Sequence, residues 1–321
     1  MLIRMTSWHP TASFGALELR ARMLRAAREY FAATKTLEVE TPTLSRAAVT
    51  DVHLASVNST VNGQPRFLHT SPEYAMKRLL ASGCGDIYQI ARVYRDGESG
   101  RFHNPEFTMI EWYRVGIDHH ALMTDVEQLA AALLPAHRSS ERAERISFRD
   151  AVQLHAGVDA FDDPISVLLG ALTNAKVDVP QGLEQDRDAC LDLIVSTLVG
   201  PKLGRDRLTF VHDFPASQAA LARVHGRVAS RFEAYLDGIE LANGFHELVD
   251  VIEQRKRFDA DNEERERRGL KRMPVDENFL AALEHGLPEC AGVALGFDRL
   301  VMCATGAKHI DEVLAFPFDR A

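Results

Sequence analysis

The stretch RFHNPEFTMIEWYR, residues 101–114, constrains the fold of this chain more than any other segment. Its second half alternates with the period of a β-strand, so side chains two positions apart share a face. One face carries Phe107, Met109, Glu111 and Tyr113. Two apolar residues followed by a carboxylate and a phenol suit neither a dry core nor open water, so packing alone does not explain this strand.

The residues before this strand predict a long antiparallel hairpin. DIYQIARVYR alternates as a strand that ends at Arg95, and the polar loop 96–105 follows. Because the loop holds Arg101 and a His-Asn-Pro break, we expect the hairpin to have a basic tip.

Two helices are predicted before the hairpin. Residues 16–33 have helical periodicity, and their apolar stripe consists of Leu17, Ala21, Leu24, Ala27 and Phe31. The arginines expected on the outer side of this helix are Arg20, Arg22 and Arg25. The segment TSPEYAMKRLLASG predicts the second helix, with Ser71 as its N-cap, Pro72 in its first turn and Gly83 at its end.

The rest of the chain predicts one α+β domain over residues 1–321, with an antiparallel sheet flanked by helices. Residues 117–205 are Ala/Leu-rich helical pieces broken by prolines, and we find no motif for chemistry in this helical insertion. Strand patterns resume in LTFVHDF, RVASRFEAYLDGIELANGFHEL and ECAGVALGF, and the charged segment 253–272 between them predicts a solvated helix.

Composition excludes several classes of protein. A net charge of −9 argues against indiscriminate nucleic-acid binding, and 46% apolar content over 321 residues allows a full core. MLIRMTSWHP lacks the apolar core of a leader, and no later run is long enough to span a membrane. The four cysteines contain no C-x-x-C pair, so we expect reduced core thiols in a cytoplasmic protein.

Charged residues in the second half allow two interpretations. Glu233, Glu240 and Glu247 are spaced by seven residues, and such carboxylates either bind Mg²⁺ or are solvated surface acids. Arg299 lies near a helix start, where it either meets a bound anion or pairs with Asp298.

Several motifs taken together resemble a known family. LEVETPTLS with its preceding helix, ARVYRDGESGRFHNPEFTMIEWY and GVALGFDRLVM resemble motifs 1, 2 and 3 of class II aminoacyl-tRNA synthetases. TSPEYAMKRLL, HNPEFTM and GIELANGFHEL are similar to the lysyl-tRNA synthetase branch. The resemblance covers nearly the whole chain and implies an ATP- and Mg²⁺-dependent, homodimeric ligase that makes an aminoacyl-adenylate.

The resemblance also implies roles for individual residues. Arg95 and Arg299 would be the catalytic pair on the phosphates of ATP. The full ATP site would consist of Arg95, Asp96, Gly97, Arg101, His103, Asn104, Phe107, Glu240, Leu241, Gly296 and Arg299. Glu233 and Glu240 would hold Mg²⁺.

The amino-acid site implied by the same motifs is rich in carboxylates. It would consist of Ser71, Pro72, Glu73, Glu111, Tyr113, Asn243, Phe245, Glu247 and Ala294. Glu73 would take the amino group near the substrate carboxylate. Glu111, Tyr113 and Glu247 would receive the distant ε-ammonium.

Three departures from lysyl-tRNA synthetases refine the expectation. The motif 1 helix starts by residue 17, which leaves no room for an anticodon-binding OB domain. Ala294 stands where those enzymes typically have glycine, and Gly97 stands where motif 2 usually has glutamate, so either Glu98 or backbone groups must read adenine. The first two departures are similar to the truncated paralogues, the elongation factor P–(R)-β-lysine ligases.

This branch implies activation of (R)-β-lysine, or lysine, and its transfer to a lysine side chain of elongation factor P. No stable tRNA binding and no membrane contact are expected. Two alternatives stay open: a minimal lysyl-tRNA synthetase that acts on tRNA, and a non-catalytic regulator that kept the fold.

Overall fold

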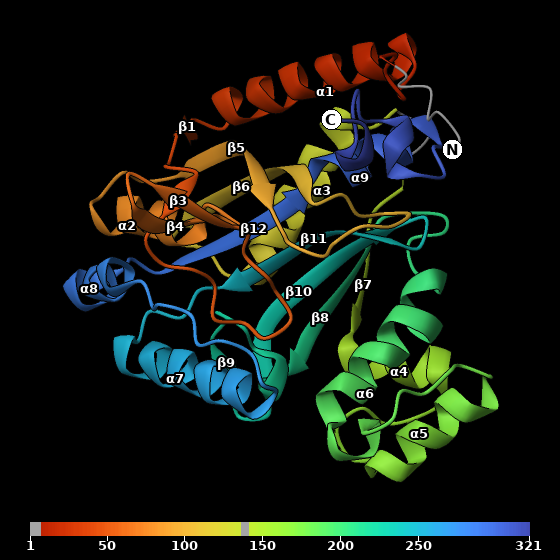
Figure 1. Ribbon diagram of the computed structural model, residues 1–321. Coiled ribbons are helices and arrows are strands. Elements are labelled where there is room, and N and C mark those ends of the chain that lie inside the picture. The colour runs from red at the N-terminus through yellow and green to blue at the C-terminus, as the bar shows by residue number, and fades with distance from the viewer. Residues whose placement is uncertain (1–7, 136–140) are drawn as a thin grey trace, which may run out of the picture.

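A computed structural model of the chain describes residues 8–135 and 141–321. It contains a nine-stranded sheet with the path β1-β5-β6-β12-β11-β10-β8-β7, from which β9 pairs with β10 (Figure 1). The strands are β1 (Leu37–Glu38), β5 (Ile87–Tyr94), β6 (Glu106–Val115), β7 (Glu144–Ser147), β8 (Thr209–Pro215), β9 (Val224–His225), β10 (Val228–Leu236), β11 (Ile239–His246) and β12 (Cys290–Gly296). Only the outer pairs β1–β5 and β7–β8 are parallel, so the predicted α+β class is confirmed.

The predicted hairpin is present as β5 and β6. The two strands are antiparallel, Gln89 lies opposite Glu111, and β5 ends at Tyr94, one residue before the predicted end. Ile110 and Trp112 are fully buried in the main core, whereas the alternate positions face a cavity described below. Because successive side chains point to opposite faces, one face of this strand packs in the core and the other lines the cavity.

Helices α1 (Phe14–Ala33), α3 (His119–Leu133) and α9 (Phe297–Thr305) cover the core face of the sheet (Figure 1). The predicted stripe of α1 is partly wrong: Ala27 and Phe31 are buried, but Ala21 is exposed. Arg20 was expected to point outward, yet it pairs with buried Asp298 of α9 and donates to Thr108 of β6 at 2.7 Å. This ion pair links α1 to α9 and balances the charge of Asp298, whose burial without a cation would be costly.

The opposite face carries helices α2 (Glu73–Ala81), α7 (Val251–Arg267) and α8 (Glu277–Gly286). A small sheet lies beside them, formed by β2 (Leu44–Ser45), β4 (Gln64–Leu68) and β3 (Asn58–Val61). The N-cap of α2 is Pro72 rather than the predicted Ser71, whose hydroxyl accepts a hydrogen bond from the Glu73 backbone N–H at 2.9 Å and donates one to Glu111. Helix α7 is not solvated all round, since Phe258 and Asn262 are buried on one side of it.

A second group of helices lies at the lower right of Figure 1: α4 (Phe148–Ala156), α5 (Ile165–Asn174) and α6 (Arg187–Ile194). Short helical turns span Leu183–Gln185, Val195–Val199, Gly200–Lys202, Ala216–Gln218, Ile310–Glu312 and Phe318–Arg320. The expected helical range 117–205 also contains strand β7, and its first helix, α3, packs in the main core. Helices α4 to α6 pack in a second hydrophobic cluster, which also contains residues of β8 and β10. The division into one domain with an insertion stays a prediction.

None of the four cysteines forms a disulfide, and three of them are buried as expected. Cys84 is exposed, because it follows the Gly83 turn that ends α2. Within the described residues no helix is both long enough and apolar enough to cross a membrane. Residues 1–7, which belong to the stretch expected to lack a leader, lie outside the described part of the chain.

Candidate active site

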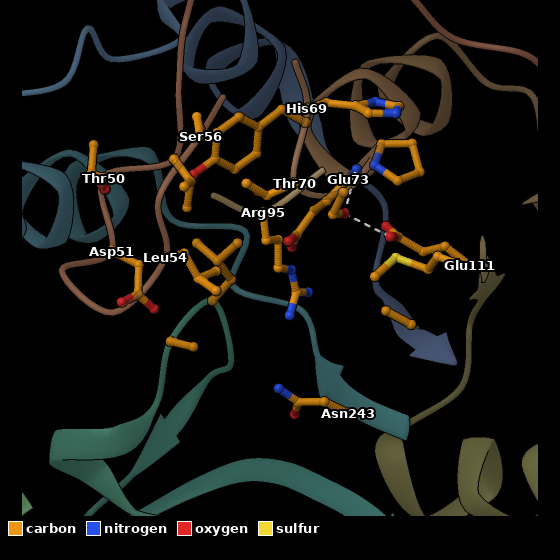
Figure 2. Close-up of a pocket in the computed structure, with 18 of the residues that line it drawn as sticks. Thr50, Asp51, Leu54, Ser56, His69, Thr70, Glu73, Arg95, Glu111 and Asn243 are labelled. Carbon is orange, nitrogen blue, oxygen red and sulfur yellow. Dashed lines mark hydrogen bonds between the residues drawn. The ribbon is translucent and has the colours of Figure 1, made fainter. Parts of the chain in front are cut away.

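A cavity of about 1110 Å³ opens on the face of the sheet opposite α1 and α3 (Figure 2). The expected site residues that line it are Ser71, Pro72, Glu73, Arg95, His103, Asn104, Phe107, Glu111, Tyr113, Glu240, Leu241, Asn243, Phe245, Glu247, Ala294, Gly296 and Arg299. Segments far apart in sequence thus meet at one cavity. Four expected residues do not line it: Asp96, Gly97, Arg101 and Glu233.

The register of the central strands explains the floor of the cavity. Glu111 lies opposite Ala294, Ala294 lies opposite Asn243, and Asn243 lies opposite Glu233. Side chains directly opposite one another point to the same face of a sheet. This row crosses four strands and has an acid at each end, and its first three members, Glu111, Ala294 and Asn243, form the floor of the cavity.

Arg95 and Phe107 form one wall at the tip of the hairpin. The guanidinium of Arg95 lies 5.1 Å from the Phe107 ring centroid, and its Nη1 atom is 3.5 Å from Glu98 Oε1. The sequence left two ways to recognise adenine, by Glu98 or by backbone groups. Because Glu98 lines the cavity, its side chain can contribute to this recognition. The buried Nε of Arg95 has no hydrogen-bond partner, which leaves a donor for an anionic ligand.

Arg299 contacts the loop of the same hairpin and is held by its neighbours. It donates from Nη1 to the Glu240 carbonyl oxygen at 2.9 Å and from Nε to the Phe102 carbonyl oxygen at 3.2 Å. Its Nη2 atom lies 2.6 Å from His103 Nε2. Burial and the Arg299 charge lower the pKa of His103, so this imidazole is neutral beside the arginine. The alternative pairing of Arg299 with Asp298 is wrong, because Asp298 binds Arg20.

The far end of the cavity is anionic and buried. Both oxygens of Glu111 accept hydrogen bonds, one from Ser71 Oγ at 2.6 Å and the other from Tyr113 Oη at 2.7 Å. Figure 2 shows Glu73 and Glu111 on neighbouring elements of this end. Desolvation and the Glu73 charge raise the pKa of Glu111 to about 7.

Lys77 was missed by the sequence-based prediction. Its ammonium is completely buried and contacts Glu73 Oε1 at 2.7 Å and Glu247 Oε2 at 2.6 Å. Burial alone would lower its pKa, but Glu247 and Glu73 outweigh burial and raise it. The available signal was its position four residues after Glu73 on the helix face that also carries buried Leu80.

The acid cluster is more negative than Lys77 can balance. Burial raises the pKa of Glu247 to about 8, despite the opposing charge of Lys77. One ammonium thus faces the carboxyls of Glu73, Glu111 and Glu247. Chemically, the arrangement suits a ligand that brings further positive charge and hydrogen-bond donors.

Gly292 also escaped the sequence-based prediction. A Cβ atom at this position would lie 2.2 Å from Tyr113 Cε1 and 2.5 Å from Glu247 Oε1. The absence of a side chain therefore lets the phenol and the carboxylate approach from the two neighbouring strands. Its place in an apolar strand gave no signal that separates this role from ordinary packing.

The expected Mg²⁺ ligands fit unequally. Glu240 lines the cavity and its side chain is 41% exposed, so its carboxylate is available to a cation. Glu233 is buried, and its oxygens already accept from Arg231 Nη2 at 2.6 Å and Tyr235 Oη at 2.5 Å. These contacts therefore favour Glu240 as the ligand, and Glu233 would be free only if Arg231 withdrew.

Three loop residues lie away from the cavity for local reasons. Arg101 stacks on Phe102 and donates to the Lys308 carbonyl oxygen at 2.8 Å. The Asp96 amide donates to the Ala55 carbonyl oxygen at 2.8 Å. Gly97 has φ +78°, a conformation that favours glycine, which accounts for a glycine where motif 2 usually has glutamate.

Comparisons with known proteins agree with this geometry. The family model described as "tRNA synthetases class II (D, K and N)" matches residues 4–320. Similar proteins include the elongation factor P–(R)-β-lysine ligases of Vibrio cholerae serotype O1, 49% identical over 98% of this chain and 99% of that protein, and of Yersinia enterocolitica, 48% identical over 98% of both. The Salmonella arizonae protein of the same name is 45% identical over 98% of both chains. The chain therefore belongs to the class II tRNA synthetase family and, within it, to the elongation factor P–(R)-β-lysine ligases.

Proposed function

We propose that this protein activates (R)-β-lysine with ATP and transfers it to a lysine side chain of elongation factor P. The observation that carries the proposal is the polarity of one cavity. Arginines and an aromatic ring gather at one end, and Glu73, Glu111 and Glu247 gather at the other. The names of the similar ligases supply the substrates.

The reaction has two steps. In the first, the substrate carboxylate attacks the α-phosphorus of ATP, a new O–P bond forms and pyrophosphate leaves. In the second, the acceptor amine attacks the carbonyl carbon of the adenylate and AMP leaves. No protein nucleophile is required, so this chain would contribute position and charge.

Each end of the cavity has a role in the first step. Arg95 would hold the α-phosphate, and Arg299 with His103 would hold the outer phosphates. Phe107 would stack on adenine, with Asn104 beside it. Arg101 joins the phosphate site in this proposal only if its contact with the Lys308 carbonyl oxygen breaks when ATP binds.

The amino-acid end would recognise two amines. Glu73 would accept the amine nearer the carboxylate, and Glu111, Tyr113 and Glu247 would surround the ε-ammonium. Asn243 and Phe245 would line the intervening methylene chain, because they lie on the strand between the two ends.

A bound Mg²⁺ would neutralise phosphate charge, and Glu240 is its proposed ligand. Glu233 would serve as a second ligand only if Arg231 moved away, because its two oxygens already accept hydrogen bonds from Arg231 and Tyr235. The cation site and Arg299 would then be adjacent, because Glu240 Oε2 lies 3.7 Å from Arg299 Nη1.

We also propose a homodimer in the cytoplasm. Leu37 and Leu44, on either side of the Pro42 segment, are 53% and 40% exposed, which suits burial against a second copy together with α1. Buried cysteines that form no disulfide suit a reducing compartment. A fully active monomer at micromolar concentration in light scattering would contradict the dimer.

Pyrophosphate exchange tests the proposed reaction. We expect exchange with (R)-β-lysine in the absence of any acceptor, and lysine-sized mass addition to elongation factor P when that protein is present. Exchange without transfer to elongation factor P, but with transfer to tRNA, would favour the minimal tRNA synthetase instead. Absence of exchange with every lysine isomer would favour the non-catalytic regulator.

A further inference from the structure

The face of the sheet opposite the cavity carries a cluster of histidines at the start of α3. His119 and His120 come from α3, His212 and Asp213 from β8, and His246 from β11. None of these five residues lines the cavity. His246 points away from it because Phe245 and Glu247, its neighbours in sequence, line the cavity.

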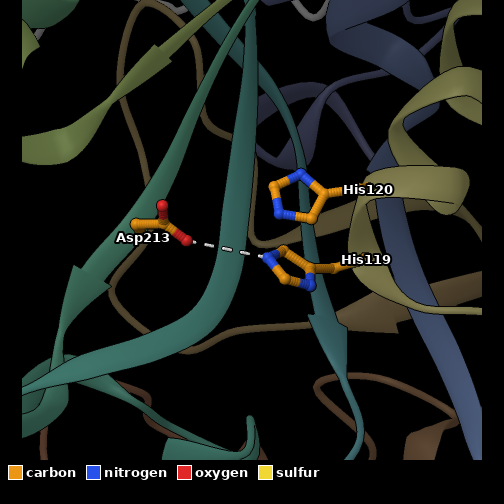
Figure 3. Close-up of side chains that lie close together, drawn as sticks. All are labelled: His119, His120 and Asp213. Atoms are coloured by element: carbon orange, nitrogen blue, oxygen red, sulfur yellow. Dashed lines mark ion pairs between the residues drawn. The ribbon is translucent and has the colours of Figure 1, made fainter. Parts of the chain in front are cut away.

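Three of these side chains have the spacing of metal ligands. Among the residues that the structure describes, His119, His120 and Asp213 are the one group whose donor atoms lie within 4.8 Å of one another. His119 Nε2 is 3.8 Å from Asp213 Oδ1, and Figure 3 shows the imidazole pointing toward the carboxylate. Ligands around tetrahedral zinc lie roughly 3.3–3.5 Å apart, so modest side-chain rotation would close the site.

A second observation is independent of this spacing. His119 is only 7% exposed, yet neither of its ring nitrogens has a hydrogen-bond partner. A buried polar group without a partner costs free energy, and a metal ion would satisfy one nitrogen directly. His120 is exposed and Asp213 is half-buried, so the group is open to ions from solvent.

The surroundings supply an outer shell and compensating charge. His212 Nδ1 lies 3.0 Å from Asp213 Oδ2, the oxygen that faces away from His119, and would orient the carboxylate. The start of a helix disfavours a cation, but Asp118, the N-cap of α3, adds negative charge near both α3 histidines.

We propose that His119, His120 and Asp213 form a divalent transition-metal site of the zinc type, separate from the catalytic cavity. Two imidazoles and one carboxylate suit Zn²⁺, with water at the remaining position. Because the ligands come from α3 and β8, the ion would tie the start of that helix to the sheet and stabilise the folded protein. This site is independent of the proposed ligase activity.

Metal titration of untagged protein, stripped with a chelator, tests the site. We expect one equivalent of Zn²⁺ per chain by calorimetry, visible d–d bands of tetrahedral geometry with Co²⁺, and a higher midpoint of thermal unfolding with Zn²⁺. His120→Ala and Asp213→Asn should each weaken Zn²⁺ binding by at least about tenfold. His120 is exposed, and asparagine tolerates the positive φ of position 213, so both variants should fold.

Two control variants locate the ion. His285→Ala removes an exposed histidine on α8, and Glu111→Gln removes a carboxylate of the cavity; neither should change Zn²⁺ affinity. Unchanged affinity in either His120→Ala or Asp213→Asn would overturn the proposal. Loss of Zn²⁺ binding in Glu111→Gln would also overturn it, by assigning the ion to the cavity.

Discussion

The two ends of the catalytic cavity differ in the sign of their charge and in how deeply their charged side chains are buried. At the phosphate end, the side chains of Arg95 and Arg299 are 24% and 21% exposed. Arg299 donates to a backbone carbonyl oxygen, and the Nε atom of Arg95 has no hydrogen-bond partner. At the amino-acid end, Lys77 and Glu247 are each 1% exposed and hold one another in an ion pair.

The difference separates catalysis from stability. Replacement of a partly exposed arginine by alanine leaves no buried charge behind, so the substitution should lower the reaction rate and change stability little. A buried ion pair is different, because deletion of one partner leaves the other charge desolvated. Variants at the two ends should therefore report on different quantities.

Lys77→Met should give the largest effect, on stability. It leaves Glu73 and Glu247 facing each other without their shared cation, which predicts a loss of about 3–5 kcal/mol in the free energy of unfolding. Urea unfolding at neutral pH measures it. Lys256→Met, at a lysine that is 79% exposed, is the control and should change stability little. If Lys77→Met and Lys256→Met had equal free energies of unfolding, the proposed difference between the two ends of the cavity would be wrong.

Arg299→Ala should instead affect chemistry. Loss of charge at the developing phosphate anion predicts a decrease in kcat for adenylate formation by about 10²–10³-fold, with a nearly unchanged unfolding midpoint. Pyrophosphate exchange and thermal unfolding measure the two quantities. Arg267→Ala, at an arginine that is 78% exposed, serves as the control. Near-wild-type exchange in Arg299→Ala would remove Arg299 from the site.

Ala294→Gly should change selectivity rather than overall rate. The Ala294 methyl lies on the cavity floor between Glu111 and Asn243, where interiors yield little to a misplaced group. Its removal should favour α-lysine over (R)-β-lysine by about 1–3 kcal/mol, the worth of one methylene-sized misfit. The ratio of kcat/KM values for the two substrates measures this shift. An unchanged ratio would mean that selectivity arises elsewhere in the cavity.

Proton release should give the smallest effect. The pKa of Glu111 is about 7 and that of Glu247 about 8, both raised by burial from the ordinary 4.5. Folded protein without substrate thus holds extra protons, and the unfolding free energy falls as pH rises from about 4.5 toward 8. An incoming ammonium favours the charged carboxylates, so lysine binding should release protons at pH 7.

The affinity for lysine should also depend on pH, because protonated carboxyls attract an ammonium less strongly than carboxylates do. Affinity for lysine should fall as pH drops from 8 to 7, by less than the roughly tenfold that one titrating group allows per pH unit. Calorimetry in buffers of different ionisation enthalpy measures the protons released. Glu106→Gln, at an exposed carboxyl on the same strand as Glu111, should leave proton release unchanged, whereas Glu111→Gln should reduce it. Proton uptake on binding would contradict this account.

The two ends also differ in what the sequence could predict. The alternation of β6 correctly separates the cavity-lining residues Phe107, Glu111 and Tyr113 from Ile110 and Trp112 of the main core, because a period of two is a local property. Most of the residues that motif resemblance assigned to the site line the cavity. Arg101 and Glu233 are among those that do not, since the Lys308 carbonyl oxygen and Arg231 engage these side chains.

The residues that escaped prediction depend on contacts between distant segments. Lys77 belongs to the buried acid cluster only because Glu247, which follows β11, lies beside α2, and Gly292 matters only because of Tyr113 and Glu247. Likewise, Arg20 turns inward for Asp298, 278 positions away. The histidine cluster joins α3 to β8, and neither segment alone carries a metal-ligand spacing.

Pyrophosphate exchange with paired substrates tests the central claim most directly, that one cavity joins a phosphate end to a diamine end. The account predicts exchange with (R)-β-lysine, weaker exchange with α-lysine, and no exchange with an amino acid of equal length in which a methyl group replaces the ε-ammonium. Equal exchange with the methyl-ended analogue would contradict it, because the buried cluster of Glu73, Glu111 and Glu247 would then have no cation to recognise.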